Sequence, residues 1–123
     1  MRGDPRARML EKARFLQGVY SFEGRGLEHP SPLSPDASYT LPRDRRAQLV
    51  YLRAGNSADE LIYLVLSQDE RPVRFFPIGA KASMHIPLAI VENVPPETRL
   101  SLSLGAPRGL RGMVLIDLGW VEL

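Results

Sequence analysis

Short apolar segments separated by turn residues fill the sequence from residue 37 onward. Most of them alternate like strands, as in Leu100–Leu104, where the leucines would face a core and the serines would face water. Turn signals recur at intervals of roughly ten residues, which is typical of β-sandwiches and barrels and not of alternating βαβ units. We therefore predict an all-β fold, a single antiparallel β-sandwich of about eight strands with a jelly-roll-like arrangement. The predicted strands are 19–23, 38–41, 48–54, 61–67, 72–78, 85–91, 100–104 and 113–118.

Three features of this pattern predict local geometry. The segments 61–67 and 72–78 are joined by a short polar turn, which indicates a hairpin. Pro87 cannot donate a ladder hydrogen bond, so it places its strand at a sheet edge or marks the start of a strand. Gly119 follows the last apolar segment and indicates either a kink or a bulge in a strand that continues to the C-terminal residue.

The N-terminal region has a different character. Asp4 before Pro5 matches a helix N-cap followed by proline at the first helical position, and Gly18 stands where a C-terminal cap would lie. These signals predict a short helix over 5–17, with a basic tail that is only transiently helical as the alternative.

The length of 123 residues fits one hydrophobic core. We expect a basic N-terminal segment, 1–18, followed by a sandwich domain, 19–123. Within that domain, residues 24–36 contain three prolines and two glycines and are expected to form a long loop.

Composition excludes several classes of protein. There is no cysteine, which removes disulfide scaffolds, thiolate metal sites and cysteine nucleophiles. The net charge is only +2, and the high isoelectric point reflects a predominance of arginine over lysine, so nucleic-acid binding is not expected. No apolar run reaches the length of a membrane span or a secretory signal, so we expect no membrane span and a cytoplasmic location.

Catalytic motifs are equally scarce. The carboxylate pairs Asp59–Glu60 and Asp69–Glu70 fall in predicted turns, and no nucleophile elbow or phosphate-binding glycine loop is present. The two histidines, His29 and His85, are far apart in sequence, which makes a metal-dependent, cupin-like enzyme the least favoured of three functional hypotheses. We expect no enzymatic activity, no metal and no cofactor.

Residues 38–123 resemble a known family. The segment Tyr51–Asn56 (YLRAGN) and the closing segment Ile116–Leu123 (IDLGWVEL) are similar to the framing strands of galactose-binding-like jelly rolls, which include many carbohydrate-binding modules. The resemblance implies binding of a sugar or another small molecule. It implies that the ligand contacts are Arg53, Asn56, His85 and Trp120.

Asp117 and Trp120 each allow two interpretations. Asp117 interrupts an apolar strand, and if it points inward it needs a partner such as Arg53. A structural pair of this kind is favoured over a ligand contact. An exposed Trp120 indole would stack on a sugar or anchor a protein interface, whereas packing in the core is the favoured alternative.

The apolar content exceeds what one small sandwich needs. Phe75 and Phe76 should point to opposite faces of one strand, and the outer ring would form an apolar patch with Tyr51 or Tyr63. The segments LIYLVLS and MVLIDL are apolar at successive positions, which indicates that both faces are covered. Our leading hypothesis is a noncatalytic interaction or accessory subunit that forms a homo-oligomer or binds a partner protein. The expected interface residues are Met9, Leu10, Leu16, Phe75 and Phe76.

Overall fold

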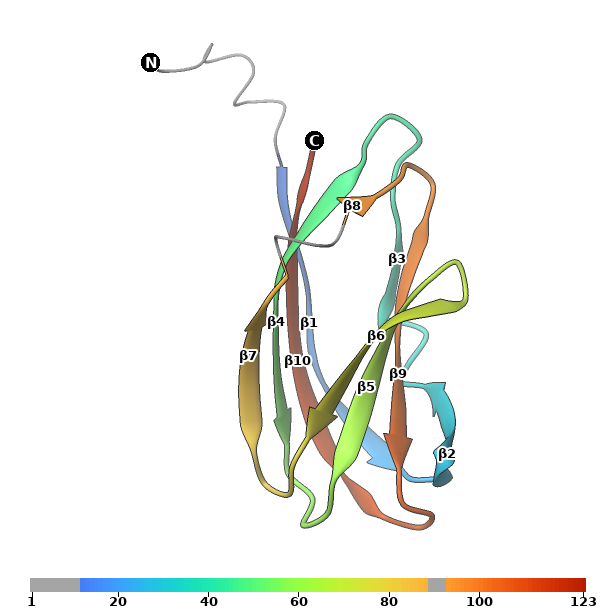
Figure 1. Ribbon diagram of the computed structural model, residues 1–123, viewed down its shortest axis with the longest axis vertical. Helices are drawn as coiled ribbons and strands as arrows, with labels where there is room; N and C mark the ends of the chain where they lie inside the picture. The colour runs from blue at the N-terminus through green and yellow to red at the C-terminus, as the bar shows by residue number, and fades with distance from the viewer. Residues whose placement is uncertain (1–11, 89–92) are drawn as a thin grey trace.

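The computed structural model describes residues 12–88 and 93–123, and these residues form two antiparallel sheets packed face to face (Figure 1). No helix lies within this part of the chain. The strands are β1 (Lys12–Glu23), β2 (Gly26–Pro32), β3 (Ser38–Thr40), β4 (Ala47–Asn56), β5 (Ile62–Gln68), β6 (Arg71–Ile78), β7 (Ser83–Pro87), β8 (Asn93–Val94), β9 (Arg99–Ala106) and β10 (Arg111–Glu122).

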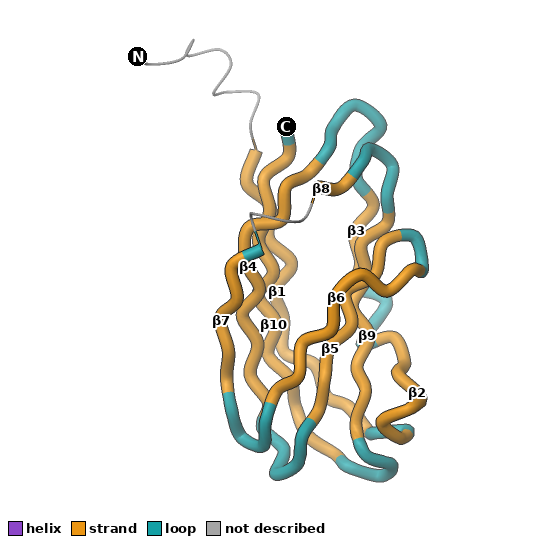
Figure 2. Tube along the Cα trace, in the orientation of Figure 1, coloured by secondary structure: helices purple, strands orange, loops and turns teal. Residues whose placement is uncertain are grey.

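The order of the strands is that of a jelly roll. Sheet A has the order β1-β10-β4-β7, with β8 paired to β4, and sheet B has the order β2-β9-β5-β6, with β3 paired to β9. The chain crosses between the sheets at most connections, which gives the two interleaved Greek keys of this architecture. Figure 2 shows that most of the connecting loops lie at the two ends of the sandwich. The predicted all-β, jelly-roll-like sandwich is therefore confirmed.

The predicted N-terminal helix is wrong where it can be compared with the structure. Residues 12–17 are the first half of β1, which pairs with β10 from Lys12, opposite Glu122, to Glu23, opposite Arg111. Leu16 and Tyr20 point inward from β1 and pack against the core, as strand alternation requires. Residues 12–18 therefore belong to sheet A, while Asp4 and Pro5 lie outside the described residues.

The expected loop over residues 24–36 is also wrong in part, because it contains β2. This strand pairs with β9 over a few residues, with a register shift between Gly26 and Ser31. It lies at the edge of sheet B, where prolines such as Pro30 and Pro32 are tolerated because no further strand requires their missing N–H donors.

The core lies between the sheets, and leucine is its commonest residue. Leu100, Leu102 and Leu104 of β9 point inward, as the alternation predicted. The β5–β6 hairpin is confirmed. Strand β7 lies at the edge of sheet A and ends at Pro87, so the predicted range 85–91 is too long at Leu88, and residues 89–91 are outside the described residues.

The irregularity predicted near Gly119 is present as a bulge. The pairing of β10 with β4 shifts between Gly119 and Trp120, which lie opposite Tyr51 and Leu49. Val50 of β4 is therefore the extra, unpaired residue.

Candidate functional site

The outer face of sheet A carries a row of polar side chains. Gln17 of β1 lies opposite Asp117 of β10, which lies opposite Arg53 of β4, which lies opposite His85 of β7. Because side chains alternate along a strand, all four leave the sheet on the same, outer side. We call these four residues the polar row.

Tyr51 connects the members of the polar row. Its hydroxyl donates a 2.8 Å hydrogen bond to Asp117 Oδ1, which also accepts a 3.1 Å bond from Gln17 Nε2. The Arg53 guanidinium lies 5.6 Å from the centroid of the Tyr51 ring, and the His85 ring meets Tyr51 edge-on at 5.7 Å. Asp117 therefore faces outward, and an inward-facing pair with Arg53 is not formed.

Gly119 allows Tyr51 to lie against the sheet. A Cβ atom at residue 119 would come within 2.3 Å of the Tyr51 ring, so a side chain there would displace the aromatic ring. The glycine that marks the bulge in the sequence therefore also leaves space for the Tyr51 ring, which contacts the polar row from the neighbouring row.

The environment of Tyr51 raises the pKa of its phenol above the ordinary value of 10.0. Burial is the largest cause, followed by the hydrogen bond to Asp117 and the charge of that carboxylate, while Arg53 acts in the opposite direction. The neutral phenol therefore contributes stability below the pKa of the unfolded chain, and this contribution is lost as the pH rises through the raised pKa.

We predict that Asp117→Asn lowers the pKa of Tyr51 toward its ordinary value without restoring it fully, because burial remains. The measurement is a phenolate absorbance titration of the wild type and the variant, with Tyr51→Phe used to assign the transition. A titration that Asp117→Asn leaves unchanged would contradict the hydrogen-bonded arrangement.

Large apolar side chains flank the polar row on the same face. Phe15, Val19, Met113 and Leu115 are 57%, 61%, 51% and 49% exposed. All four belong to β1 and β10, and we call them the apolar ridge. The successive apolar residues of β10 thus leave one set of side chains exposed, whereas Val65 on the outer face of β5 is buried.

Beside the ridge the face is hollowed around Gly55. A pocket of about 430 Å³ lies between Arg53, Gly55, Ser83, His85 and Leu115, and a second of about 350 Å³ adjoins it on the side of Val19 and Met113. Gly55, Ser83 and Leu115 line both pockets, and Gly55 has no side chain to fill the space between them. We call this depression the Gly55 hollow.

The structure brings together two of the four predicted ligand residues. Arg53 and His85 are exposed neighbours in the polar row. Asn56 is buried, and its amide donates bonds of 3.0 Å to each of the Glu60 and Gly79 carbonyls, while its Oδ1 accepts the N–H of Ala58 at 2.8 Å. Asn56 therefore holds two turns together and does not face a ligand.

Trp120 lies in the core, where its ring packs 5.2 Å from that of Tyr39, so the exposed, sugar-stacking alternative is wrong. Its Nε1 donates a 3.2 Å hydrogen bond to the buried Glu122, which also forms an ion pair of 3.7 Å with Arg14. Burial and contact with Glu122 raise the pKa of Tyr39. Sequence reasoning missed this cluster, although Trp120 and Glu122 share the strand parity of the inward-facing Leu118.

The two histidines do not form a common site. His29 lies on β2 of sheet B, whereas His85 lies on β7 of sheet A. Within residues 12–88 and 93–123, no group of three or more histidine, cysteine, aspartate or glutamate side chains is placed to hold a metal ion.

The predicted interface residues are scattered. Phe75 is exposed on the outer face of sheet B, with its ring 6.0 Å from that of Tyr63, whereas Phe76 points into the core, as the strand alternation predicted. Leu16 is half-buried against the core. Met9 and Leu10 lie outside the described residues.

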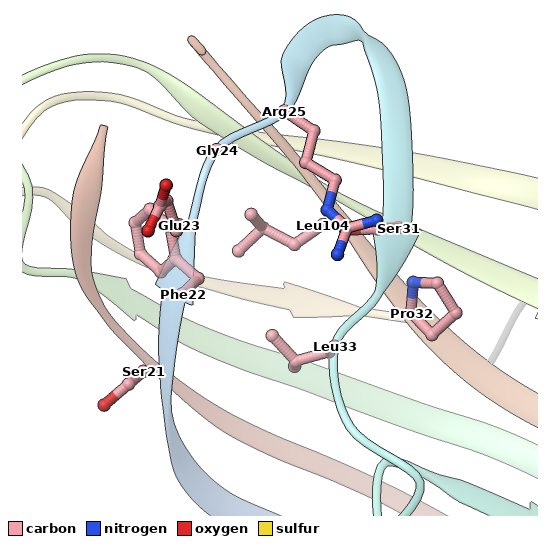
Figure 3. A pocket seen from close by; sticks show the side chains of 9 residues that line it. All are labelled: Ser21, Phe22, Glu23, Gly24, Arg25, Ser31, Pro32, Leu33 and Leu104. Atoms are coloured by element: carbon pink, nitrogen blue, oxygen red, sulfur yellow. The ribbon is translucent and has the colours of Figure 1, made fainter. Parts of the chain in front are cut away.

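A separate pocket of about 370 Å³ opens at the edge of the sandwich, where β1 passes into β2 (Figure 3). The side chains of Phe22, Leu33 and Leu104 surround its inner part, and Arg25 reaches over it toward Ser31. Phe22 and Leu33 pack against the core, so this pocket is an opening at the margin of the hydrophobic interior.

The strand order defines this chain as a jelly-roll β-sandwich domain. The outer face of its sheet A carries both the apolar ridge and the polar row. No family model and no curated protein matches the sequence. In fold, the chain is similar to part of the protein in a structure of infectious bursal disease virus, Gt strain, with a TM-score of 0.47 and 11% identity over 91% of this chain and 32% of that one.

It is also similar to part of the exo-β-1,3-galactanase of Phanerochaete chrysosporium, with a TM-score of 0.34 and 6% identity over 86% of this chain and 29% of that one. The chain thus spans about a third of the length of these proteins. Among its described residues, no helix is long and apolar enough to cross a membrane.

Proposed function

We propose that this chain is a noncatalytic interaction module that binds a protein partner through the outer face of sheet A. The observation that carries the proposal is the apolar ridge, four large side chains exposed together on two adjacent strands. Side chains on the outer face of a sandwich are ordinarily polar, and contiguous exposed apolar surface marks interaction sites.

The polar row adds the features that make such a surface specific. Interface centres are enriched in tyrosine and arginine, and Tyr51 and Arg53 lie between the ridge and the edge strand β7. The hydrogen bond to Asp117 holds Tyr51 in place before any partner arrives, and the Arg53 guanidinium lies against the Tyr51 ring. An ordered surface of this kind loses little conformational entropy on binding.

The outer face of sheet B supports the proposal less well. The hydroxyl of Tyr63 donates a hydrogen bond to the carbonyl of Leu27, so its polar end is occupied within the chain. Ser101 and Ser103 point outward from the central strand β9, as expected for a surface in contact with water. Phe75 is the large exposed ring on this face.

The same surface supports a noncatalytic role. A nucleophilic mechanism needs a nucleophile, a base and an orienting group joined by hydrogen bonds. In the described part of the chain no hydrogen bond joins His85 to Ser83 or to Asp117, whose Oδ1 accepts bonds from Gln17 and Tyr51. We do not propose carbohydrate binding, because Asn56 and Trp120, two of its four expected contacts, are buried.

Leu115→Arg tests the proposal by placing a charge in the middle of the apolar ridge. The tagged full-length chain, expressed in its native cells, should elute from size-exclusion chromatography of the extract as part of a complex. We expect the variant to elute at the size of the free chain, because a central apolar anchor replaced by a charge weakens binding by about 10- to 100-fold.

Phe75→Arg is the matched control, since it introduces the same side chain at an exposed residue of the opposite face. It should elute with the wild type. The proposal is wrong if Leu115→Arg elutes with the wild type, or if Phe75→Arg is the variant that releases the chain.

A further inference from the structure

We propose that the partner of this face is a second copy of the chain, related by a twofold axis that runs parallel to the strands between β10 and β4. The inference rests on the proposed function and names its partner. It follows from the sizes and charges of the side chains on this face. The side chains on its β1–β10 half are complementary to those on its β4–β7 half.

Side chains of the outer face form three rows across sheet A, and each row crosses β1, β10, β4 and β7 in that order. The rows are Phe15, Gly119, Tyr51, Pro87; then Gln17, Asp117, Arg53, His85; then Val19, Leu115, Gly55, Ser83. In the third row the two large apolar residues lie on the β1–β10 half, and the two small residues lie on the β4–β7 half.

A twofold rotation about this axis keeps each row at its own level and exchanges the two halves. Strand β10 of one copy then faces β4 of the other, and the contact is isologous, so every interaction occurs twice. In the third row, Leu115 of each copy faces the Gly55 hollow of the other. Val19 faces Ser83 in the same way.

The second row provides the charge complementarity. Asp117 of each copy faces Arg53 of the other, which places two carboxylate–guanidinium pairs across the interface. Both hydrogen bonds that Asp117 accepts within the chain go to Oδ1, so Oδ2 is available for an incoming guanidinium. Arginine presents several N–H donors in a planar fork and can bind such an oxygen while its ring contact with Tyr51 is kept.

The shape of the two surfaces suits the packing of one sheet on another. Aligned sheets pack about 10 Å apart with their side chains interdigitated. A protruding residue must therefore meet a depression, as Leu115 does at the Gly55 hollow. Binding to a partner of unrelated sequence would not require the two halves of this face to be complementary to each other.

Complementary charge reversals of the full chain provide the test. Arg53→Asp places two aspartates at positions 53 and 117, and Asp117→Arg places two arginines there, so each variant should repel its own copy. We expect wild type to sediment as a dimer and each variant as a monomer, with self-association weakened at least about 100-fold. An equimolar mixture should restore a dimer containing one chain of each kind, which native mass spectrometry identifies by mass.

Circular dichroism melting establishes that each variant is folded. If either charge variant does not fold, Gly55→Leu tests the same interface at the Gly55 hollow without changing any charge, and it should also be monomeric. The second-copy proposal is overturned if purified wild type remains a monomer at the highest attainable concentration, if the folded variants dimerise as wild type does, or if their mixture stays monomeric.

Failure of this proposal is distinguishable from failure of the proposed function. If the purified chain is a monomer while Leu115→Arg still releases it from a complex in the extract, the partner is a different protein. If Leu115→Arg has no effect in the extract either, the outer face of sheet A is not a binding surface.

Discussion

Gly55→Leu should leave the sandwich folded and separate it from its partner. A Cβ atom at residue 55 would lie 3.9 Å from the Leu115 Cβ, an ordinary contact, so the single chain has room for the new side chain. Replacing a glycine within a strand also removes an entropic cost of folding. The added leucine occupies the Gly55 hollow, however, and overpacking at a close-packed contact should weaken association by about 10- to 100-fold.

Sedimentation velocity measures the association, and thermal melting measures the fold. Gly79→Leu is the matched control, because Gly79 is exposed in the turn before β7 and its Cβ would meet only the Ala82 Cβ, at 3.8 Å. The control should associate as wild type does. Undiminished association of Gly55→Leu would show that the hollow is not filled on binding.

Asn56→Asp, one residue further along β4, should instead unfold the protein or bring it close to unfolding. The Asn56 amide donates to the carbonyls of Glu60, Ile78 and Gly79 at 3.0, 3.4 and 3.0 Å. Aspartate has the same shape but presents an acceptor to three acceptors. We expect the free energy of unfolding to fall by about 3 kcal/mol or more. The reason is that each buried unpaired polar group costs about 1–3 kcal/mol and a buried charge costs more.

Denaturant unfolding of the two proteins measures this loss. Asn93→Asp makes the same chemical change at an exposed residue of β8 and should alter stability by less than about 0.5 kcal/mol. Equal stability of Asn56→Asp and Asn93→Asp would contradict the role that we assign to Asn56, which is to hold the two turns together by hydrogen bonds.

The sequence was most informative where one side of a strand is buried. Leu100–Leu104 alternates because the leucines enter the core and the serines do not, so its pattern predicted its geometry. The N-terminal part of β1 was mistaken for a helix because Asp4, Pro5 and Gly18 match the signals that begin and end a helix. Its conformation is determined by pairing with β10, about 100 residues later, which no local pattern contains.

The candidate site was predicted only in part for a related reason. Arg53 and His85 were predicted together as ligand contacts, but only the register of the strands places them in one row with Gln17 and Asp117. Register between distant strands depends on the whole fold. The burial of Trp120 had an available signal, since Trp120 shares its parity with Ile116 and Leu118 of the same strand.

The structure shows where the excess apolar residues of the sequence lie. Part of it is absorbed by the sandwich itself, as at Val65 on the outer face of β5. The remainder lies on β1 and β10 as the apolar ridge, beside a hollow that the ridge of a second copy would fit.

Hydroxyl-radical footprinting of the chain, free and within its native complex, tests most directly whether the outer face of sheet A is the binding surface. We predict that Phe15, Met113 and Leu115 are modified more slowly in the complex, while Phe75 and Tyr63 on the opposite face react at the same rate in both states. Protection of Phe75 and Tyr63 with unchanged reactivity of Leu115 and Met113 would contradict the account.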